Sequence, residues 1–339
     1  MKLLKSILKN VVNFKGVTIG TLEKILGSYI TYHLRPKASA DIDISADTLN
    51  TNSKVAIIIQ GPLLKKDNFT LNTIQIYKKF FSNYQIILST WKDEDNDYLN
   101  EMRNEQIEII LNDKPSFPGI QNINYQILST RNAVNKAREI GVDYVLKTRT
   151  DIRLYNPNSI EFLVNLLKTF PPVKESGQNK RIAFPSLNTF KYRPYSVTDI
   201  VMFGETNDMM DYWSVSFDTR TTSPADVLIG DFSRARLGEI YLSTNYLEKI
   251  GRELKWTISD SWDAFASCFC IFDAQSIGLY WNKHDRNREY RRSRYNVTRN
   301  DQELNFAEWL NIFAGLNNKH AIPEYILNDQ FAAEIKGQI

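Results

Sequence analysis

The sequence has few cysteines and histidines, the residues that most often hold metals or covalent cross-links. Cys268 and Cys270 are its two cysteines, and it has three histidines in 339 residues. Two cysteines separated by one residue would point to the same face of a strand, where they are poorly placed to bond to each other. We therefore expect two buried thiols in a reducing cytosol. The alternative, a metal site at the C-x-C pair, lacks a second pair of ligands.

Several signals of whole protein classes are also missing. No apolar run is long enough to span a bilayer, and lysines interrupt the apolar residues after Met1, so neither a membrane span nor a signal peptide is predicted. The G-x-G-x-x-G and G-x-x-x-x-G-K-[ST] patterns are absent, which removes the usual support for dinucleotide binding and P-loop phosphate transfer. A net charge of +3 is too small to argue for nucleic acid as a partner.

The first 53 residues are expected to form a basic amphipathic helical segment and a linker. Apolar residues recur at near-helical spacing over residues 1–34 with lysines among them, and Pro36 lies in the polar stretch that follows. Such a helix either lies in a membrane interface or packs on the protein with its lysines facing water. We expect the main domain over residues 54–300 and a helical C-terminal tail over residues 301–339.

Short apolar runs alternate with helical periodicity after Lys54. This pattern is typical of an α/β protein with a mostly parallel central sheet. The expected strands of the first half cover residues 55–59, 84–88, 106–111 and 142–146, and the helices cover residues 68–81 and 121–140. Beyond Asp151 we expect helices over residues 157–169, 207–213, 224–229 and 238–250, and strands over residues 181–185 and 199–203.

Polar residues follow four of the expected strands. The carboxyl ends of parallel strands meet at one edge of a sheet, where ligands bind. The residues concerned are Gln60, Gly61 and Pro62, Ser89 to Trp91, Asn112 and Asp113, and Arg149 to Asp151. Gly61 would let the backbone approach a ligand closely, and Trp91 would either stack on a base or pack in the core.

Two further stretches carry polar residues in a pattern. Arg149, Asp151 and Arg153 alternate after an apolar strand, which suits a metal ion or a phosphate, or else a surface salt bridge. Polar residues at positions 122, 126, 129 and 130 share one face near the start of the expected helix 121–140. A helix N-terminus favours anions, so this face is either part of a ligand site or a stripe that faces solvent.

The ordered set of these pieces resembles the WavE family of bacterial lipopolysaccharide and capsule synthesis proteins, and more broadly a glycosyltransferase of the GT-A type. The resemblance covers about residues 54–285. The residues that carry it are Gln60 to Pro62, Asn124 to Gln126, Ser129 and Thr130, Lys147 to Asp151, Asp199 to Gly204, Gly238 to Leu242, and Gly278 to His284. It implies a Rossmann-like, mostly parallel sheet flanked by helices, with a mixed extension on the acceptor side.

The resemblance also implies a donor site and a metal. GT-A enzymes carry a D-x-D motif that holds a divalent metal on the donor pyrophosphate, and here Arg149 replaces the first acid. Asp151 would then hold Mn²⁺ or Mg²⁺, with His284 completing the site, or Arg149 would neutralise the pyrophosphate without a metal. The residues expected to contact the donor are Gln60, Gly61, Pro62, Trp91, Ser129, Thr130, Arg131, Lys147, Arg149 and Asp151.

An inverting transferase needs a carboxylate that takes the proton of the acceptor hydroxyl. Glu239 opens an expected helix where a GT-A base commonly lies, and Asp199 is the second candidate. Asp260 and Asp263 are further carboxylates that could instead be helix-cap or turn residues, and for Asp260 the cap or turn is favoured. The arginines of residues 283–299 suit a loop that closes over the pyrophosphate, a contact with anionic lipids or glycans, or a solvated face.

We therefore expect a glycosyltransferase that acts on a surface-glycan acceptor, located in the cytoplasm and in peripheral contact with the inner face of the cytoplasmic membrane. Two alternatives stay open. One is a nucleotidyl- or phosphoryl-transferase built on the same sheet, and the other is a non-catalytic module that binds nucleotides or glycans.

Overall fold

The computed structural model describes residues 35–42, 52–173, 176–221, 233–284 and 302–315, together with Thr21 and Ile25. The chain divides into two compact units, Met1–Pro36 and Lys37–Ile339. In the first unit Thr21 and Ile25 are helical and exposed, and the rest of the expected amphipathic helix lies outside the described residues. The expected helix 224–229 and the arginines after residue 284 also lie outside them.

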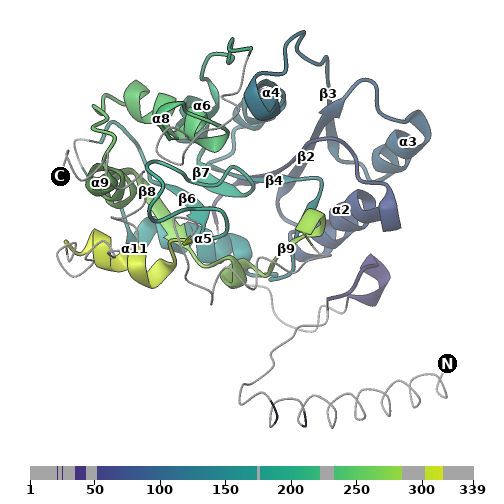
Figure 1. The fold of residues 1–339 in the computed structure, drawn as a ribbon. Coiled ribbons are helices and arrows are strands. Elements are labelled where there is room, and N and C mark those ends of the chain that lie inside the picture. Colours follow the sequence, from purple (N-terminus) through teal and green to yellow (C-terminus); the bar gives the residue numbers. More distant parts are fainter. Residues whose placement is uncertain are drawn as a thin grey trace. The chain divides into compact units, whose positions relative to one another are not determined.

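The second unit is built on a seven-stranded sheet (Figure 1). Strand β7 pairs antiparallel with β4 and β6, and all other neighbours pair in parallel. The strands in spatial order are β3 (Glu108–Asn112), β2 (Gln85–Trp91), β1 (Val55–Gln60), β4 (Tyr144–Arg149), β7 (Met202–Glu205), β6 (Ile182–Pro185) and β8 (Phe269–Phe272). The mostly parallel sheet with a mixed extension confirms the expected fold class.

The two central strands show why the sequence pattern locates the sheet. Every residue of β1 is buried, and β4 is buried from Tyr144 to Thr148. Strands that are covered on both faces are apolar throughout, whereas half-exposed strands alternate. Their register places Gln60 beside Arg149, so the polar residues that end the two strands are neighbours.

Helices cover both faces of this sheet. One face carries α4 (Ile123–Ile140), α6 (Thr206–Trp213) and α8 (Glu239–Lys249), and the other carries α2 (Phe69–Phe80) and α5 (Ser159–Thr169) (Figure 1). The remaining helices are α3 (Asn96–Asn104), α9 (Ile258–Cys268) and α11 (Phe306–Phe313), the last two packed beside β8. Among the described residues, no helix is long and apolar enough to cross a membrane.

Short elements complete the second unit. Strands β5 (Ile152–Leu154) and β9 (Leu279–Trp281) form a small antiparallel sheet that directly follows the end of β4. This sheet brings residue 281 next to residue 152, across a long stretch of chain. The 3₁₀ helices are η1 (Ser39–Asp41), η2 (Lys66–Asn68), η3 (Ile120–Asn122), η4 (Ala274–Ile277) and η5 (Asn282–His284).

Three local expectations change in the structure. Strand β7 begins at Met202, so Asp199 lies in the loop before it and not in the strand. Cys268 ends a helix and Cys270 lies in a strand, so the pair does not share one extended segment. Both thiols are free and buried, as expected, and burial raises the pKa of Cys268. Helix α3 was not expected because its sequence is polar, with Tyr98, Leu99 and Met102 as its buried residues.

Candidate active site

The end of β4 carries a paired arginine and aspartate. Arg149 donates to both carboxylate oxygens of Asp151, from Nε to Oδ1 at 2.9 Å and from Nη2 to Oδ2 at 3.1 Å. Trp281 of β9 adds a third donor, from its indole Nε1 to Oδ2 at 3.0 Å. Burial alone would raise the pKa of Asp151, but the charge and hydrogen bonds of Arg149 lower it below its ordinary value. Asp151 is therefore ionised at neutral pH, and both of its oxygens accept hydrogen bonds.

The turn after β1 is tied to the turn after β4. Gly61 has a φ of +124° and donates its backbone N–H to Ser89 O at 3.0 Å. Thr150 donates from its N–H to Gln60 O at 3.1 Å and from Oγ1 to Pro62 O at 2.6 Å. A Cβ atom at position 61 would lie 3.1 Å from Thr150 Oγ1, so glycine allows this close approach. The predicted residues Gly61 and Pro62 therefore lie beside Arg149 and Asp151.

Behind this edge, a buried hydrogen-bond network joins α4 to three strand ends. Gln60 Nε2 donates to Ser129 Oγ at 2.9 Å, and Ser89 Oγ donates to the carbonyl of Ser129 at 2.7 Å. Asn112 Nδ2 donates to Ser89 Oγ at 2.9 Å, and Asn132 Nδ2 donates to Asn112 Oδ1 at 2.8 Å. Of the polar stripe expected on this helix, Ser129 thus bonds to the sheet and Asn122 is exposed, while among the described residues Gln126 Oε1 and Thr130 Oγ1 are buried without a hydrogen-bond partner.

The other residues expected around the donor lie in different surroundings. Trp91 is buried, 4% exposed, and meets Tyr125 edge-on with ring centroids 5.4 Å apart. Thr130 is fully buried, and Arg131 places its guanidinium 5.1 Å from the ring centre of Phe217. Trp91 and Thr130 are thus buried away from solvent, and the partly exposed Arg131 packs on Phe217.

Lys147 lies two residues before Arg149 in β4, deeper in the sheet. It is fully buried, its Nζ donates to the backbone carbonyl of Asp199, and it lies 5.3 Å from the ring centre of Trp213. Burial lowers the pKa of Lys147 to about 8, against the opposing effect of the Asp199 charge. Lys147 thus fixes the loop that carries Asp199, and it does not reach the surface itself.

The predicted base, Glu239, is the first residue of α8. Gly238 precedes it with a φ of +55°, and a Cβ atom there would lie 2.5 Å from Gln121 Oε1. Glycine therefore allows the start of α8 to approach the start of α4. Burial and the nearby charge of Asp199 raise the pKa of Glu239 to about 7, while a hydrogen bond from Ser196 Oγ at 3.0 Å opposes the shift. A carboxyl group with this pKa can exchange protons at neutral pH.

Asp199 connects the two sides of the site. Its charge raises the pKa of Lys147, of Arg149 and of Glu239, so it lies within electrostatic range of all three. The structure therefore gathers the residues that the sequence singled out at β4, in the loop before β7 and at the start of α8. They form one group at the carboxyl edge of the sheet.

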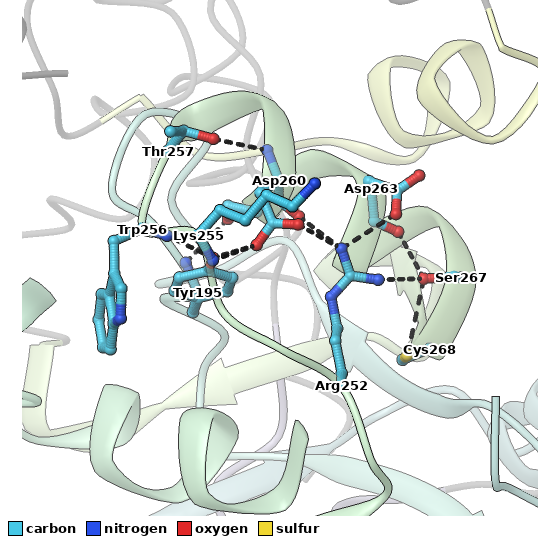
Figure 2. A network of polar contacts seen from close by, with 10 residues as sticks. Tyr195, Arg252, Lys255, Trp256, Thr257, Asp260, Asp263, Ser267 and Cys268 are labelled. Atoms are coloured by element: carbon cyan, nitrogen blue, oxygen red, sulfur yellow. Dashed lines mark hydrogen bonds and ion pairs between the residues drawn. The ribbon is translucent and has the colours of Figure 1, made fainter. Parts of the chain in front are cut away.

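A separate buried network holds the loop that precedes β7 (Figure 2). Tyr195 has a φ of +59°, donates its hydroxyl to Asp260 Oδ2 and accepts from the backbone N–H of Trp256 at 3.0 Å. Its own N–H donates to Ser261 Oγ at 2.8 Å, and its carbonyl accepts from Ser243 Oγ at 2.6 Å. These bonds fix a strained residue immediately before Ser196, and so they position the partner of Glu239.

The same network decides the role of Asp260. Thr257, not Asp260, caps α9, because its side chain accepts from the N–H of Asp260. The Asp260 carboxylate accepts from Arg252 Nη2 at 2.6 Å and from the N–H of Lys255 at 3.0 Å, as well as from Tyr195. Arg252 also bonds Asp263 Oδ2 at 3.0 Å (Figure 2). Both aspartates are thus structural, and neither faces the group around Glu239.

Two residues of the site were not predicted from the sequence. Ser196 bonds the carboxylate of Glu239, and Trp281 bonds that of Asp151. Ser196 had no local signal, because its partner is 43 residues away. Trp281 lies in the segment Gly278 to His284 that carried the family resemblance, but its contact with Asp151 spans 130 residues. His284 ends η5, close in sequence to Asn282, whose N–H donates to Asp151 O at 2.9 Å. The side chain of His284 lies outside what the structure describes.

Comparison with known proteins gives one family. A sequence model described as WavE lipopolysaccharide synthesis matches residues 55–332. No curated protein matches the sequence significantly.

Solved structures with a similar course of the chain include three sugar- and nucleotide-linked enzymes. A Bacillus anthracis protein described as a glucose-1-phosphate thymidylyltransferase is 11% identical, with 58% of this chain and 84% of that chain covered and a TM-score of 0.35. A 4-diphosphocytidyl-2C-methyl-D-erythritol synthase is 11% identical (60% and 87% covered, TM-score 0.34). A CMP:2-keto-3-deoxy-manno-octonic acid synthetase is 10% identical (50% and 80% covered, TM-score 0.32). Likenesses at this level carry no argument about activity.

Proposed function

Since this chain belongs to the WavE lipopolysaccharide synthesis family, we propose that it is a nucleotide-sugar-dependent glycosyltransferase that acts on a bacterial surface glycan. The observation that carries this proposal is the group at the carboxyl edge of the sheet. There a paired, partly exposed Arg149 and a carboxyl group whose pKa is about 7, Glu239, both lie within electrostatic range of Asp199. A cation for the donor and a base for the acceptor are the two things that such a transfer needs.

On the donor side, we assign the diphosphate to the exposed end of β4. Arg149 supplies the positive charge, and the turn formed by Gly61 and Pro62 lies directly beside it. Lys147, Ser129 and Trp91 are buried behind this edge, where they hold the strands, the helix α4 and the loop before β7 in place. In this proposal they shape the donor site from behind and do not touch the phosphates.

On the acceptor side, we assign the base to Glu239 and keep Asp199 as the second candidate. Glu239 would take the proton of the acceptor hydroxyl while the oxygen of that hydroxyl attacks the anomeric carbon of the sugar. The bond between that carbon and the phosphate oxygen breaks, and the nucleoside diphosphate leaves with the electron pair. Arg149 then balances the charge that develops on the leaving phosphate.

A divalent metal was expected from the D-x-D comparison, with Asp151 and His284 as its ligands. The residues present do not fit such a metal, because both oxygens of Asp151 already accept from Arg149 and one also accepts from Trp281. Within the described parts of the chain, no three histidine, cysteine or acidic side chains cluster as metal ligands would. We therefore derive no step through a metal.

The experiment that tests the function is a donor screen followed by a transfer assay. Purified full-length protein is melted with UDP-, GDP- and CMP-sugars, because a ligand that binds the folded state raises the melting temperature. The donor that stabilises the protein is then assayed for nucleotide release with lipopolysaccharide or capsule fragments as acceptors. We expect acceptor-dependent release that is lost in E239Q. Binding without turnover would favour a non-catalytic module, and pyrophosphate or phosphate as the released product would favour nucleotidyl or phosphoryl transfer.

We further propose that the protein acts at the inner face of the cytoplasmic membrane. The support is the lysine-containing apolar pattern of residues 1–34, which suits an anionic lipid surface. Flotation of the protein with vesicles that contain phosphatidylglycerol checks this. We expect co-flotation that falls with rising salt, and a protein that stays at the bottom with anionic vesicles at low salt would contradict it.

A further inference from the structure

Both oxygens of the Asp151 carboxylate already accept hydrogen bonds. Oδ1 accepts from Arg149 Nε at 2.9 Å, and Oδ2 accepts from Arg149 Nη2 at 3.1 Å and from Trp281 Nε1 at 3.0 Å. A metal bound to this carboxylate would compete with Arg149 for it and would lie next to the positive charge of the guanidinium. Like charges at such short range repel strongly in a partly buried site.

Arg149 in turn is held so that one edge of its guanidinium remains available. Its Nε and Nη2 face Asp151, and among the described residues no acceptor is bonded to Nη1. The side chain is 25% exposed, and its guanidinium carbon lies 6.0 Å from the ring centre of Trp281. Asp151 and Trp281 thus fix the plane of the guanidinium before any ligand arrives, which reduces the entropy lost on binding.

The surroundings of the free edge suit an anion. The charge of Asp151 is compensated by Arg149, and the Gly61 turn closely approaches Thr150, the residue between them. An arginine oriented in this way forms paired, charge-assisted hydrogen bonds with phosphate oxygens. The ligand class that matches is a diphosphate group.

We propose that Arg149 binds the diphosphate of the donor directly, in place of a divalent cation, and that Asp151 and Trp281 are positioning residues for its guanidinium. This inference rests on the proposed function for the identity of the donor, but the diphosphate site itself is testable without a sugar. In this motif the Arg149 guanidinium then takes the place of the metal cation. Asp151 holds that guanidinium in position and does not bind a metal.

The first experiment measures binding of inorganic pyrophosphate, UDP and GDP to the full-length protein by calorimetry, in EDTA and in Mn²⁺. We expect the tightest of these probes to bind equally well in both conditions. R149A should weaken it by about tenfold or more, because a hydrogen bond to a charged group is lost. R103A is the matched control, since Arg103 is an exposed arginine on α3, and it should bind like the wild type. Methylguanidinium added to R149A should restore part of the affinity.

The second experiment tests the anchors and the metal. Rescue by methylguanidinium should disappear in R149A/W281F, although R149A and R149A/W281F melt alike, because the indole N–H that holds the Asp151 carboxylate in place has gone. R149D places acids on both sides of Thr150. We therefore expect this variant to bind Mn²⁺, measured by electron paramagnetic resonance, and to need Mn²⁺ for nucleotide binding. The wild type should do neither.

The outcomes separate this inference from the proposed function. Mn²⁺ binding by the wild type together with metal-dependent nucleotide binding would overturn it, whether or not sugar transfer is found. Folded wild-type protein that binds none of the three probes in EDTA would overturn it as well. Binding in EDTA that R149A abolishes supports it, even if no sugar is transferred and the proposed function fails. If R149D does not fold, R149A with its rescue still decides the question.

Discussion

Ser196 Oγ donates a hydrogen bond to Glu239 Oε1 at 3.0 Å, and this joins the loop before β7 to the first residue of α8. The bond stabilises the ionised carboxylate, whereas burial and the charge of Asp199 stabilise the protonated form. The balance leaves the pKa of Glu239 at about 7. Small changes around Glu239 should therefore move its protonation state at physiological pH.

The first prediction concerns the pH dependence of transfer. A base must be deprotonated, so kcat/KM should rise with pH, reach half its maximum near the Glu239 pKa of about 7 and level off above it. E239Q should lower kcat by about 10²- to 10⁴-fold with donor affinity unchanged. The control is E248Q on the same helix, where Glu248 pairs with Arg236 on the surface. Equal loss of activity in both variants would indicate a structural effect on α8.

A second prediction follows from Ser196. S196A removes a hydrogen bond that favours the ionised form, so the midpoint of the pH profile should move upward. The maximal rate at high pH should stay within a fewfold of the wild type. S214A removes an exposed serine hydroxyl on the same sheet face and should leave the profile unchanged. A midpoint that stays fixed in S196A would remove Glu239 as the titrating group.

The third prediction concerns Lys147 and stability. Its pKa is about 8 in the folded protein, below the ordinary lysine value of 10.5, so the unfolded chain binds more protons between these values. The free energy of unfolding should therefore rise with pH across that window, by up to about 3 kcal/mol. K147M should remove this contribution and raise stability at neutral pH relative to the wild type.

Urea unfolding at pH 7 and at pH 10 measures this difference. K168M, which replaces an exposed lysine on α5, is the control and should follow the wild type at both values. If K147M retains the full pH dependence of the wild type, the buried ammonium is not its source.

The fourth prediction concerns the network around Tyr195. Y195F removes a buried hydroxyl that bonds the Asp260 carboxylate and the N–H of Trp256, so it should cost about 1.5–3 kcal/mol of unfolding free energy. Y241F is the control, because Tyr241 makes one hydrogen bond, to Ser216 O, near the surface. Urea titration compares the two, and equal losses would argue against a special role of the buried network.

The sheet could be predicted because its strands are locally encoded. Val55 to Ile59 and Tyr144 to Leu146 are apolar on both faces, which marks central strands without any knowledge of their partners. Helix α3 was not predicted, since its sequence is polar overall, although its three buried residues share one face of the helix. The end of a strand is also local, and for this reason Arg149 and Asp151 could be singled out as a pair.

The rest of the site depends on contacts between distant parts of the chain. Trp281 reaches Asp151 because β9 pairs with β5, and Ser196 reaches Glu239 because Tyr195 is clamped by α8 and α9. For Trp91 the local position was misleading. Its place at the end of a strand suggested a ligand contact, but Tyr125 of α4 packs against its ring. Whether a side chain at a strand end is open or covered depends on the helix packed over it.

The reversed direction of β7 places two residues of the candidate site in one connection. Strand β6 ends at Pro185 on the same edge where β7 begins at Met202, and residues 186–201 join the two strands there. Ser196 and Asp199 both lie in this connection, and the buried hydrogen bonds of Tyr195 hold it in place. Ser196 bonds Glu239, and the carbonyl of Asp199 accepts from Lys147. A substitution that loosens the bonds of Tyr195 should therefore disturb Glu239 and Lys147 together.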